Sequence, residues 1–520
     1  MRILLEMRPA LDGYAGIPQE TRLLFQALTQ LDDMDIEGLL QSSNCLLARA
    51  LPANPVSASN RLSVDEEINR LSRVVVSLQQ DAQPKVSEKL LTLFALGVAT
   101  TGMLLRHLIG QDQKLGRFSA THFKDFIWRS IFAKTLPFDD FDRVTRADFR
   151  VFRVPWAAMH ASALLTRKLG RALYPRLDTR DFDIMIAETP YPATVTKGTK
   201  LIVRYHDAIP VLMPHTIINK SFHQASHYHA LRRNVLDGAF FACVSDATRN
   251  DLLSIFPQIE DRVVTIHNMV SHHYFDEPSN PGRVPDIIRT RTHIGGKVFG
   301  YKLQHQNVMS NSASGPLMYL LMVSTIEPRK NHLTLLSAWE RLRTENFPEL
   351  KLVIVGTLGW GHQAIVNKFS PWLEHGDLFM LEDVPAEELR VLYQHASATI
   401  CPSFGEGFDF SGVEAMRCGG AVVASDIAVH REIYADAALY FSPYSATEAA
   451  AAISVVISSD ATNTRLKLVE AGATVSKRYL PEKILPQWHA FLQGWRDSKG
   501  ASSISLGFFP QSAPISSLPQ

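Results

Sequence analysis

The chain has 520 residues, too many for one typical hydrophobic core, and this length predicts two domains. Hydrophobic residues make up 46% of the sequence and charged residues 20%, an ordinary balance for a globular protein. The formal net charge of +1 indicates no broad basic surface, so nucleic acid is not expected as a partner. No two of the four cysteines lie within metal-ligand spacing, and we expect buried free thiols in a reducing compartment.

The first predicted element is a strand at residues 2–7, followed by a turn-rich loop at 9–18 and a helix. A strand, a glycine loop and a helix in this order tolerate a bound phosphate, and Thr21 and Arg22 near the helix start either bind an anion or are solvated. The N-terminus does not have the pattern of a signal peptide, because the apolar run before Glu6 is only three residues long. We therefore expect a cytoplasmic protein.

Residues 45–175 lack the alternation of strands and helices, and we interpret them as a helical insertion in the first domain. Predicted helices cover residues 65–78, 90–109, 123–133 and 156–173. The uncharged run at 90–105 is shorter than the roughly 20 residues that a membrane-spanning helix needs, so it predicts a buried or interfacial helix.

Basic residues with apolar neighbours recur in this insertion and would suit a peripheral contact with the inner face of a membrane. A solvated helical cover is the favoured alternative. The basic residues concerned are Arg129, Lys134, Arg143, Arg146, Arg150, Arg153, Arg167, Lys168 and Arg171.

Strands and helices alternate again beyond the insertion. The predicted strands are 182–187, 201–205, 239–244 and 263–266, then 319–323, 352–355, 378–381, 399–401, 422–424 and 439–441. In the second half, helices are predicted at 333–343, 364–369, 387–395, 413–417 and 446–458. Repeated strand–helix units predict parallel sheets with helices on both faces, and two such halves imply a cleft between them.

The predicted organisation follows from these patterns and from shifts in composition. It consists of a first domain at 1–275, a linker at 276–316, a second domain at 317–485, a C-terminal helix at 486–497 and a disordered tail at 498–520.

Arg329 and Lys330 follow the strand at 319–323 and precede the helix at 333–343. Cations at a helix N-terminus oppose the helix dipole, at a cost of roughly 0.3–1 kcal/mol each. An anion bound at this position would reverse that effect. We therefore predict an anion site here, with two solvated side chains as the alternative.

The stretch 401–416 places Glu406 in a glycine-rich loop and Glu414 in the first turn of a helix. Two carboxylates spaced in this way suit the paired hydroxyls of a sugar or a ribose. Glu414 has an alternative role, because Ser411 and Glu414 match a capping box.

His206 and Asp207 stand at the end of the strand at 201–205. A single histidine at such a place is more often structural than a ligand. The predicted anion site on the facing domain, with its two cations, favours a ligand role for His206. Both interpretations stay open.

These stretches together resemble the signature of the retaining family 4 glycosyltransferases. The resemblance rests on 404–408 with 413–416 and 422–426, and it covers 317–445 strongly. Weaker matches cover 1–30 and 180–275. The motifs at His206–Asp207, Val244–Asp246, His267–Asn268 and Glu327–Asn331 fall in the expected order.

This resemblance implies a GT-B architecture: an α/β fold of two Rossmann-like parallel-sheet domains facing a cleft, with the donor nucleotide held mainly by the second. By the same resemblance, Lys330 pairs with the donor diphosphate and Glu414 binds the ribose hydroxyls. The implied catalytic residues are His206, Lys330 and Glu406. The implied donor-binding residues are Gly16, Arg329, Lys330, Glu406, Gly407, Phe408, Asp409, Phe410 and Glu414.

The sequence departs from the family pattern at several positions. Asp409, Phe410 and Ser411 stand where many members have Gly, Leu and Pro, and Thr325 stands at the place of the usual arginine. Arg329 is expected to supply the missing charge.

The resemblance implies a retaining transfer of a hexose from a nucleotide-diphosphate sugar to a glycan or lipid-linked acceptor. By resemblance only, GDP-mannose is the favoured donor, in bacterial surface-polysaccharide or lipopolysaccharide synthesis. The alternatives are a nucleotide-sugar epimerase of GT-B fold and a non-catalytic sugar-nucleotide-binding protein. No metal or other cofactor is expected, because cations and helix N-termini stabilise a leaving diphosphate. Three Asp-X-Asp triplets, which begin at Asp33, Asp140 and Asp181, are interpreted as solvated acids.

Overall fold

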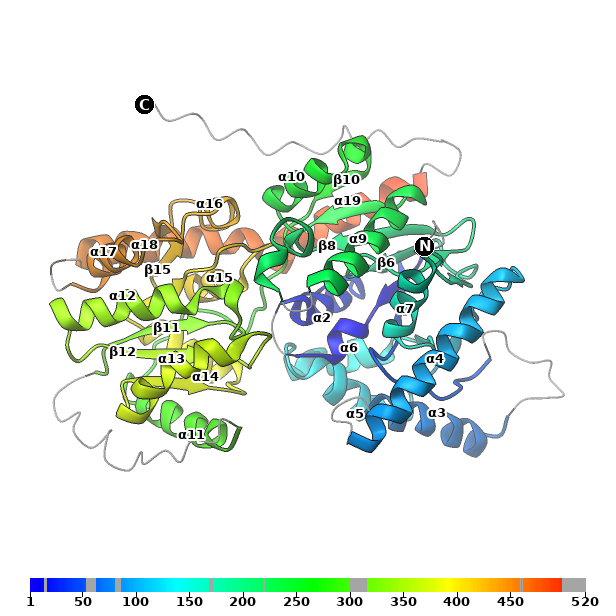
Figure 1. Cartoon of the computed structure of the whole chain (residues 1–520), viewed down its shortest axis with the longest axis horizontal. Coiled ribbons are helices and arrows are strands. Elements are labelled where there is room, and N and C mark those ends of the chain that lie inside the picture. The colour runs from blue at the N-terminus through cyan, green and yellow to red at the C-terminus, as the bar shows by residue number, and fades with distance from the viewer. Residues whose placement is uncertain are drawn as a thin grey trace.

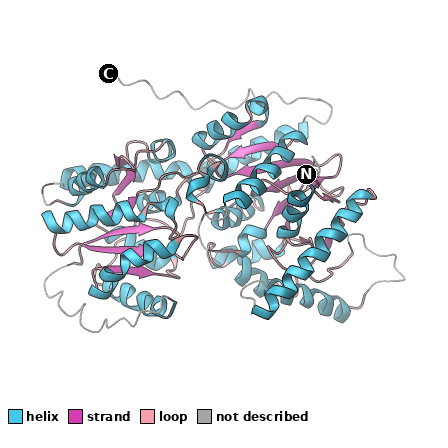
Figure 2. Cartoon of the chain, in the orientation of Figure 1, coloured by secondary structure: helices cyan, strands magenta, loops and turns pink. Residues whose placement is uncertain are grey.

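The computed structural model describes residues 1–13, 16–52, 62–79, 86–167, 172–217, 220–298, 316–458, 460 and 462–497. Two sheets form its two halves, with the N-terminal half at the right of Figure 1 and the second half at the left. Helices cover both faces of each sheet (Figure 2). The predicted tail at 498–520 lies outside the described residues.

The first sheet has eight strands in the order β10-β9-β8-β6-β1-β2-β4-β3. Every neighbouring pair is parallel except β3 and β4. The central strands are buried on both faces, which explains why they read as continuous apolar runs. The strands are β1 (Arg2–Glu6), β2 (Asp35–Leu40), β3 (Gly116–Phe118), β4 (Phe149–Val151), β6 (Ile184–Ala187), β8 (Lys200–Tyr205), β9 (Phe240–Cys243) and β10 (Val263–Thr265).

The helices around this sheet connect its strands. They are α1 (Arg8–Leu11), α2 (Ile17–Leu28), α8 (Ile209–Leu212), α9 (Lys220–Leu236) and α10 (Asp246–Ile255). A separate parallel pair consists of β5 (Arg176–Leu177) and β7 (Thr194–Val195). Ser245 caps α10 as the sequence predicts, since its side chain accepts a hydrogen bond from the Thr248 N–H at 3.1 Å.

The range 45–175 is not purely helical, because β3 and β4 within it extend the first sheet. Both strands span three residues, which is too short for a recognisable strand pattern. The helices of this range are α3 (Val64–Gln79), α4 (Val86–Leu108), α5 (Lys124–Ile127), a π-helix (Trp128–Phe132), α6 (Phe141–Arg146) and α7 (Trp156–Thr166). Within the described ranges, none of the helices is both long and apolar enough to cross a membrane.

The second sheet has six parallel strands in the order β13-β12-β11-β14-β15-β16. They are β11 (Tyr319–Val323), β12 (Lys351–Val355), β13 (Leu378–Leu381), β14 (Ala398–Cys401), β15 (Val422–Ser425) and β16 (Ala438–Phe441), all within one residue of the predicted ranges. The helices are α12 (His332–Glu345), α13 (His362–His375), α14 (Ala386–His395), α15 (Phe410–Arg417), α16 (Ala428–Tyr434), α17 (Ala446–Ile457) and α18 (Thr462–Val475).

The predicted linker contains a helix, α11 (Arg283–Val298), so the expectation of a loop there is wrong in part. Val284, Ile287 and Ile288 lie on one face of α11 and are buried against the core of the second sheet. The Pro, Gly and Ser content of this range conceals that apolar spacing.

The last described helix, α19 (Pro481–Asp497), returns from the second half to the first (Figure 1). Its residues Ile484, Trp488 and Leu492 are buried in the same core as strand β1. The two halves are therefore tied by packing as well as by the connection between them. The predicted domain boundaries themselves stay a prediction.

Candidate functional site

The loop after β14 meets the first half of the chain at the carboxyl ends of both sheets. Gly407 lies so close to the end of β8 that a Cβ atom there would stand 1.8 Å from the carbonyl oxygen of His206. A Cβ atom at Gly405 would meet the Sδ atom of Met213 at 2.8 Å. A side chain at Gly407 would collide with backbone, so this glycine in particular allows the two halves to touch.

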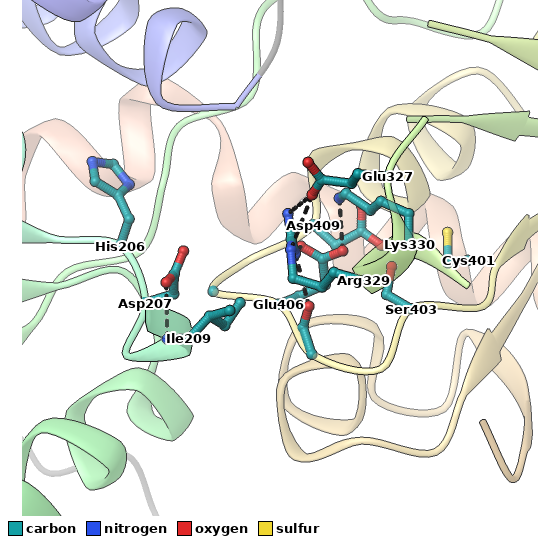
Figure 3. A network of polar contacts seen from close by, with 12 residues as sticks. His206, Asp207, Ile209, Glu327, Arg329, Lys330, Cys401, Ser403, Glu406 and Asp409 are labelled. Carbon is teal, nitrogen blue, oxygen red and sulfur yellow. Dashed lines mark hydrogen bonds and ion pairs between the residues drawn. The ribbon is translucent and has the colours of Figure 1, made fainter. Parts of the chain in front are cut away.

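Arg329 and Lys330 converge on Glu406, as Figure 3 shows. The Lys330 Nζ lies 2.6 Å from the Glu406 Oε1, and the Arg329 Nη1 lies 2.7 Å from the Oε2. Burial raises the pKa of Glu406, but the charges of Arg329 and Lys330 outweigh it, and the net pKa is lowered. The predicted anion site and the predicted sugar ligand thus form one buried, ionised cluster.

Arg329 has further partners that restrict it. Its guanidinium donates to the Gly405 carbonyl at 2.8 Å and pairs with the Glu327 carboxylate at 2.9 Å. Burial raises the pKa of Glu327, and the Arg329 charge partly offsets this effect. Arg329 therefore holds the Glu406 loop in place, whereas the only ion pair recorded for Lys330 among the described residues is with Glu406.

Asn331, for which the sequence predicted no separate role, joins the loop after β11 to the loops after β14 and β16. Its φ is 60°, a left-handed conformation that Asn tolerates better than most residues. Its side-chain amide donates to the carbonyls of Pro402 at 2.9 Å and Pro443 at 2.8 Å.

Glu414 is not part of a capping box. Helix α15 begins at Phe410, with Asp409 at the N-cap position, so Ser411 lies inside the helix. The Glu414 carboxylate instead accepts hydrogen bonds from the Gln19 amide at 2.9 Å and the Tyr393 hydroxyl at 3.1 Å. Burial raises the pKa of Glu414 to about 7, against the lowering effect of these two donors.

Asp409 is a buried anion at the start of α15. One carboxylate oxygen lies 3.1 Å from the His430 Nε2, and the other accepts from the Ser411 hydroxyl at 2.7 Å. Burial raises the pKa of Asp409, but the His430 hydrogen bond and the Lys330 charge hold it well below its usual range.

The ring of His206 is turned away from the Glu406 cluster (Figure 3). Its Nε2 lies 3.4 Å from the Glu188 carboxylate. Burial lowers the pKa of His206 to about 4 and raises that of Glu188 to about 8, so at neutral pH the ring is neutral and the acid is protonated. The structure thus brings the His206 backbone, but not its ring, to the predicted site.

A buried charged cluster surrounds Glu188 and was missed by the sequence analysis. Arg204 pairs with Glu20 at 2.9 Å, and both side chains are fully buried. Glu6 pairs with Arg8 at 3.0 Å and accepts the Glu188 N–H at 2.9 Å. Glu6 ends β1 and Glu188 directly follows β6. Acids at the carboxyl ends of two buried strands were a sequence signal that could have identified this cluster.

Gly16 precedes α2 with a φ of 72° and is exposed, while Arg22 on the same helix is fully buried. The Arg22 Nη2 donates to the carbonyls of Ala10, Asp12 and Gly13 at 2.7, 2.8 and 2.7 Å. Both sequence readings of Arg22, an anion ligand or a solvated side chain, are therefore wrong, because its guanidinium holds the glycine loop. Gln19, in the first turn of the helix that follows this loop, donates to Glu414.

A second contact between the halves uses Glu432 of α16. Its two carboxylate oxygens accept from the N–H groups of Asp246 at 2.7 Å and Ala247 at 2.9 Å, which open α10. The His267 Nε2 lies 2.8 Å from the same carboxylate. This geometry is an anion site at a helix N-terminus, filled by the protein itself.

No group of three or more His, Cys, Asp or Glu side chains within the described ranges is arranged to hold a metal ion. The independence from metal stays a prediction.

Comparison with known proteins matches residues 310–475 to the family of glycosyl transferases group 1. The chain is 27% identical over 280 residues to O-antigen chain mannosyltransferase B of Escherichia coli, covering 52% of this chain and 66% of that protein. It is 35% identical over 150 residues to the serotype-specific mannosyltransferase WbdA of Escherichia coli, covering 28% of this chain and 18% of the relative. The chain therefore spans less than two thirds of either relative.

Solved structures share the overall fold. The superposition on sucrose-phosphate synthase from Thermosynechococcus elongatus covers 96% of this chain and 99% of that chain, with 12% identity and a TM-score of 0.54. The superposition on Anabaena HepE in complex with UDP-glucose covers 95% of this chain and 99% of that chain, with 14% identity and a TM-score of 0.53. The predicted GT-B fold class is confirmed.

Proposed function

We propose, from the match of residues 310–475 to the family of glycosyl transferases group 1, that the chain transfers a hexose from a nucleotide-diphosphate sugar to a glycan or lipid-linked acceptor. The observation that carries the proposal is the convergence of Arg329, Lys330 and Glu406 where the two halves touch. The similarity to an O-antigen chain mannosyltransferase and to a serotype-specific mannosyltransferase supports mannose as the sugar, and GDP-mannose is our favoured donor.

Lys330 has the central role in this proposal. Its ammonium group would exchange the Glu406 carboxylate, now at 2.6 Å, for a phosphate oxygen of the donor. When the bond between the sugar and the phosphate breaks, charge develops on the leaving diphosphate, and a fixed cation stabilises it. Arg329 stays with Glu327 and orients the loop.

Glu406, released by Lys330, would then face the hydroxyls of the transferred sugar. The backbone N–H groups from Gly407 to Phe410 would line the same side. Glu414 would accept the ribose hydroxyls, since carboxylates accept paired hydroxyls well. Retention at the anomeric carbon is part of the proposal, as is a role for His206, whose ring must turn away from Glu188 to reach the donor.

The experiment that tests this function compares Lys330→Ala with Lys368→Ala, which removes an exposed lysine of α13 in the same half. Donor binding is followed by the thermal shift with GDP-mannose and other nucleotide sugars, because a bound donor stabilises the folded protein. We expect Lys330→Ala to stay folded and to lose about 100-fold or more in turnover, in line with the loss of one electrostatic donor. Lys368→Ala should behave as wild type.

Turnover of Lys330→Ala near that of wild type would overturn the anion-site assignment. Incubation with the donor alone separates the alternatives: an isomerised sugar nucleotide would identify an epimerase. Binding of the donor without transfer or isomerisation would identify a non-catalytic binding protein.

We also propose a peripheral membrane contact through the insertion. Helix α4 exposes Val98, Leu105 and, just beyond its end, Ile109. Burial and the neighbouring charges of Arg49 and Arg106 lower the pKa of Arg153, so three basic groups lie near one another. Sedimentation with anionic liposomes at low salt tests the idea, with Leu105→Glu as the variant expected to release the protein; no binding by the wild type would refute it.

A further inference from the structure

The loop 403–409 carries Glu406 between β14 and α15. Its glycines give the backbone little restraint of their own. Arg329 and Lys330 hold the Glu406 side chain in the unliganded protein. If the donor diphosphate takes over Lys330, as the proposed function requires, Glu406 loses one of these two partners. Arg329 then remains as its partner, together with the contacts that restrain the two ends of the loop.

A buried chain of hydrogen bonds joins the two ends of this loop. The Ser425 hydroxyl donates to the Ser403 carbonyl at 2.6 Å, and the His430 Nδ1 lies 2.9 Å from the Ser425 carbonyl. The His430 Nε2 lies 3.1 Å from the Asp409 carboxylate. Ser403 is 2% exposed, and Ser425 and His430 are fully buried.

His430 links the two ends of the loop through both of its ring nitrogens. The Nδ1 atom faces the Ser425 carbonyl and, at 3.1 Å, the Ser425 hydroxyl, and the Nε2 atom faces the Asp409 carboxylate. A hydrogen bond to an ionised carboxylate is stronger than one between neutral groups.

Asp409 itself is in a conformation that needs support. Its φ of 63° lies in the left-handed region, which costs a residue with a side chain about 1–2 kcal/mol relative to the right-handed region. The Ser411 hydroxyl holds its second carboxylate oxygen, and the Tyr434 hydroxyl donates to its carbonyl at 3.3 Å. The surroundings thus determine the direction in which the chain leaves the loop and enters α15.

We propose that Asp409 and His430 are positioning residues of the donor site: by joining the ends of loop 403–409, they set where the Glu406 carboxylate stands opposite Lys330. This inference rests on the proposed function for its consequence in catalysis. The restraint on the loop is a property of the unliganded protein and is measurable without a donor.

The test uses Asp409→Gly and His430→Gln. Glycine adopts a φ of 63° without strain, so Asp409→Gly removes the carboxylate while sparing the backbone. Ser411→Ala is the matched control, because it removes a partner of Asp409 but leaves the link to His430. Hydrogen exchange of the amides at 404–408 is measured without ligand, and kcat and KM for the donor are measured separately.

We expect faster exchange at 404–408 in both variants and a fall in kcat of about 10- to 100-fold, as for a catalytic group displaced by about 1 Å. The KM for the donor should change by less than about 3-fold, since the diphosphate is bound by Lys330 and kcat carries the loss of transition-state contacts. Ser411→Ala, which keeps the link between Asp409 and His430, should show smaller changes than either variant in exchange and kcat.

Wild-type exchange and wild-type kcat in Asp409→Gly would overturn the inference. So would a variant that melts at a lower temperature but keeps the wild-type kcat at temperatures where it is folded. If wild-type protein transfers sugar from no nucleotide sugar, the proposed function fails. The exchange data would then still decide whether the Asp409–His430 pair restrains the loop.

Discussion

The side-chain amide of Gln19 donates a 2.9 Å hydrogen bond to the carboxylate of Glu414, which lies 395 residues further along the chain. The Tyr393 hydroxyl occupies the other oxygen of the same carboxylate at 3.1 Å. Two ribose hydroxyls would offer the same pair of donors. Gln19 therefore joins the two halves through the group that we propose to bind the donor ribose.

Replacing Gln19 should make the nucleotide bind more tightly. In Gln19→Ala, the Glu414 oxygen is open to a ribose hydroxyl without competition, and we expect the Kd for GDP, measured by calorimetry, to fall several-fold. The unliganded protein should lose about 1–3 kcal/mol of stability, because a buried acceptor loses its donor. Gln26→Ala on the same helix, which removes a hydrogen bond to Asp140 within the first half, serves as the control. Weaker nucleotide binding would instead make Gln19 a ligand of the donor.

Glu432 should hold the two halves together. Glu432→Gln keeps the size of the side chain but removes the charge from the N-terminus of α10, a change of roughly 0.3–2 kcal/mol. We expect a larger radius of gyration by small-angle scattering in the unliganded variant, and a return toward the wild-type value when donor is added. Glu448→Gln changes an exposed acid at the start of α17 and should leave the radius unchanged. An unchanged radius in Glu432→Gln would contradict this role.

Glu188 should make the protein less stable as the pH rises. Burial raises the pKa of Glu188 to about 8 in the folded state, whereas the unfolded value is about 4.3. The folded state therefore keeps a proton that the unfolded state releases. The contribution of Glu188 to the free energy of unfolding is full below about pH 4 and is lost progressively up to about pH 8.

The measurement compares Glu188→Gln with wild type by thermal unfolding between about pH 5 and 9. The melting temperature of the variant relative to wild type should rise with pH, since each pKa unit corresponds to about 1.4 kcal/mol. Glu349→Gln, at an exposed position, should show no such trend. A pH-independent difference for Glu188→Gln would mean that this acid is ionised in the folded protein.

Most of the strands were predictable because parallel strands buried on both faces are continuous apolar runs. The strands β11 and β13 match their predicted ranges, and the polar loops that follow the strands contain the candidate site. Strands β3 and β4 span three residues each and carry no comparable local signal. Helix α11 was missed because the Pro and Gly residues within it concealed the apolar face.

Local pattern and chemistry thus determined two parallel-sheet halves and identified Arg329, Lys330, Glu406 and Glu414 as candidate site residues. Only the tertiary structure decided how these groups are partnered. Glu414 meets Gln19 instead of capping its helix, the His206 ring faces Glu188, and Asp409 is held by His430. The physical reason is that hydrogen bonds and ion pairs form between groups on different strand ends, and the separation of those groups along the chain leaves no local pattern to read.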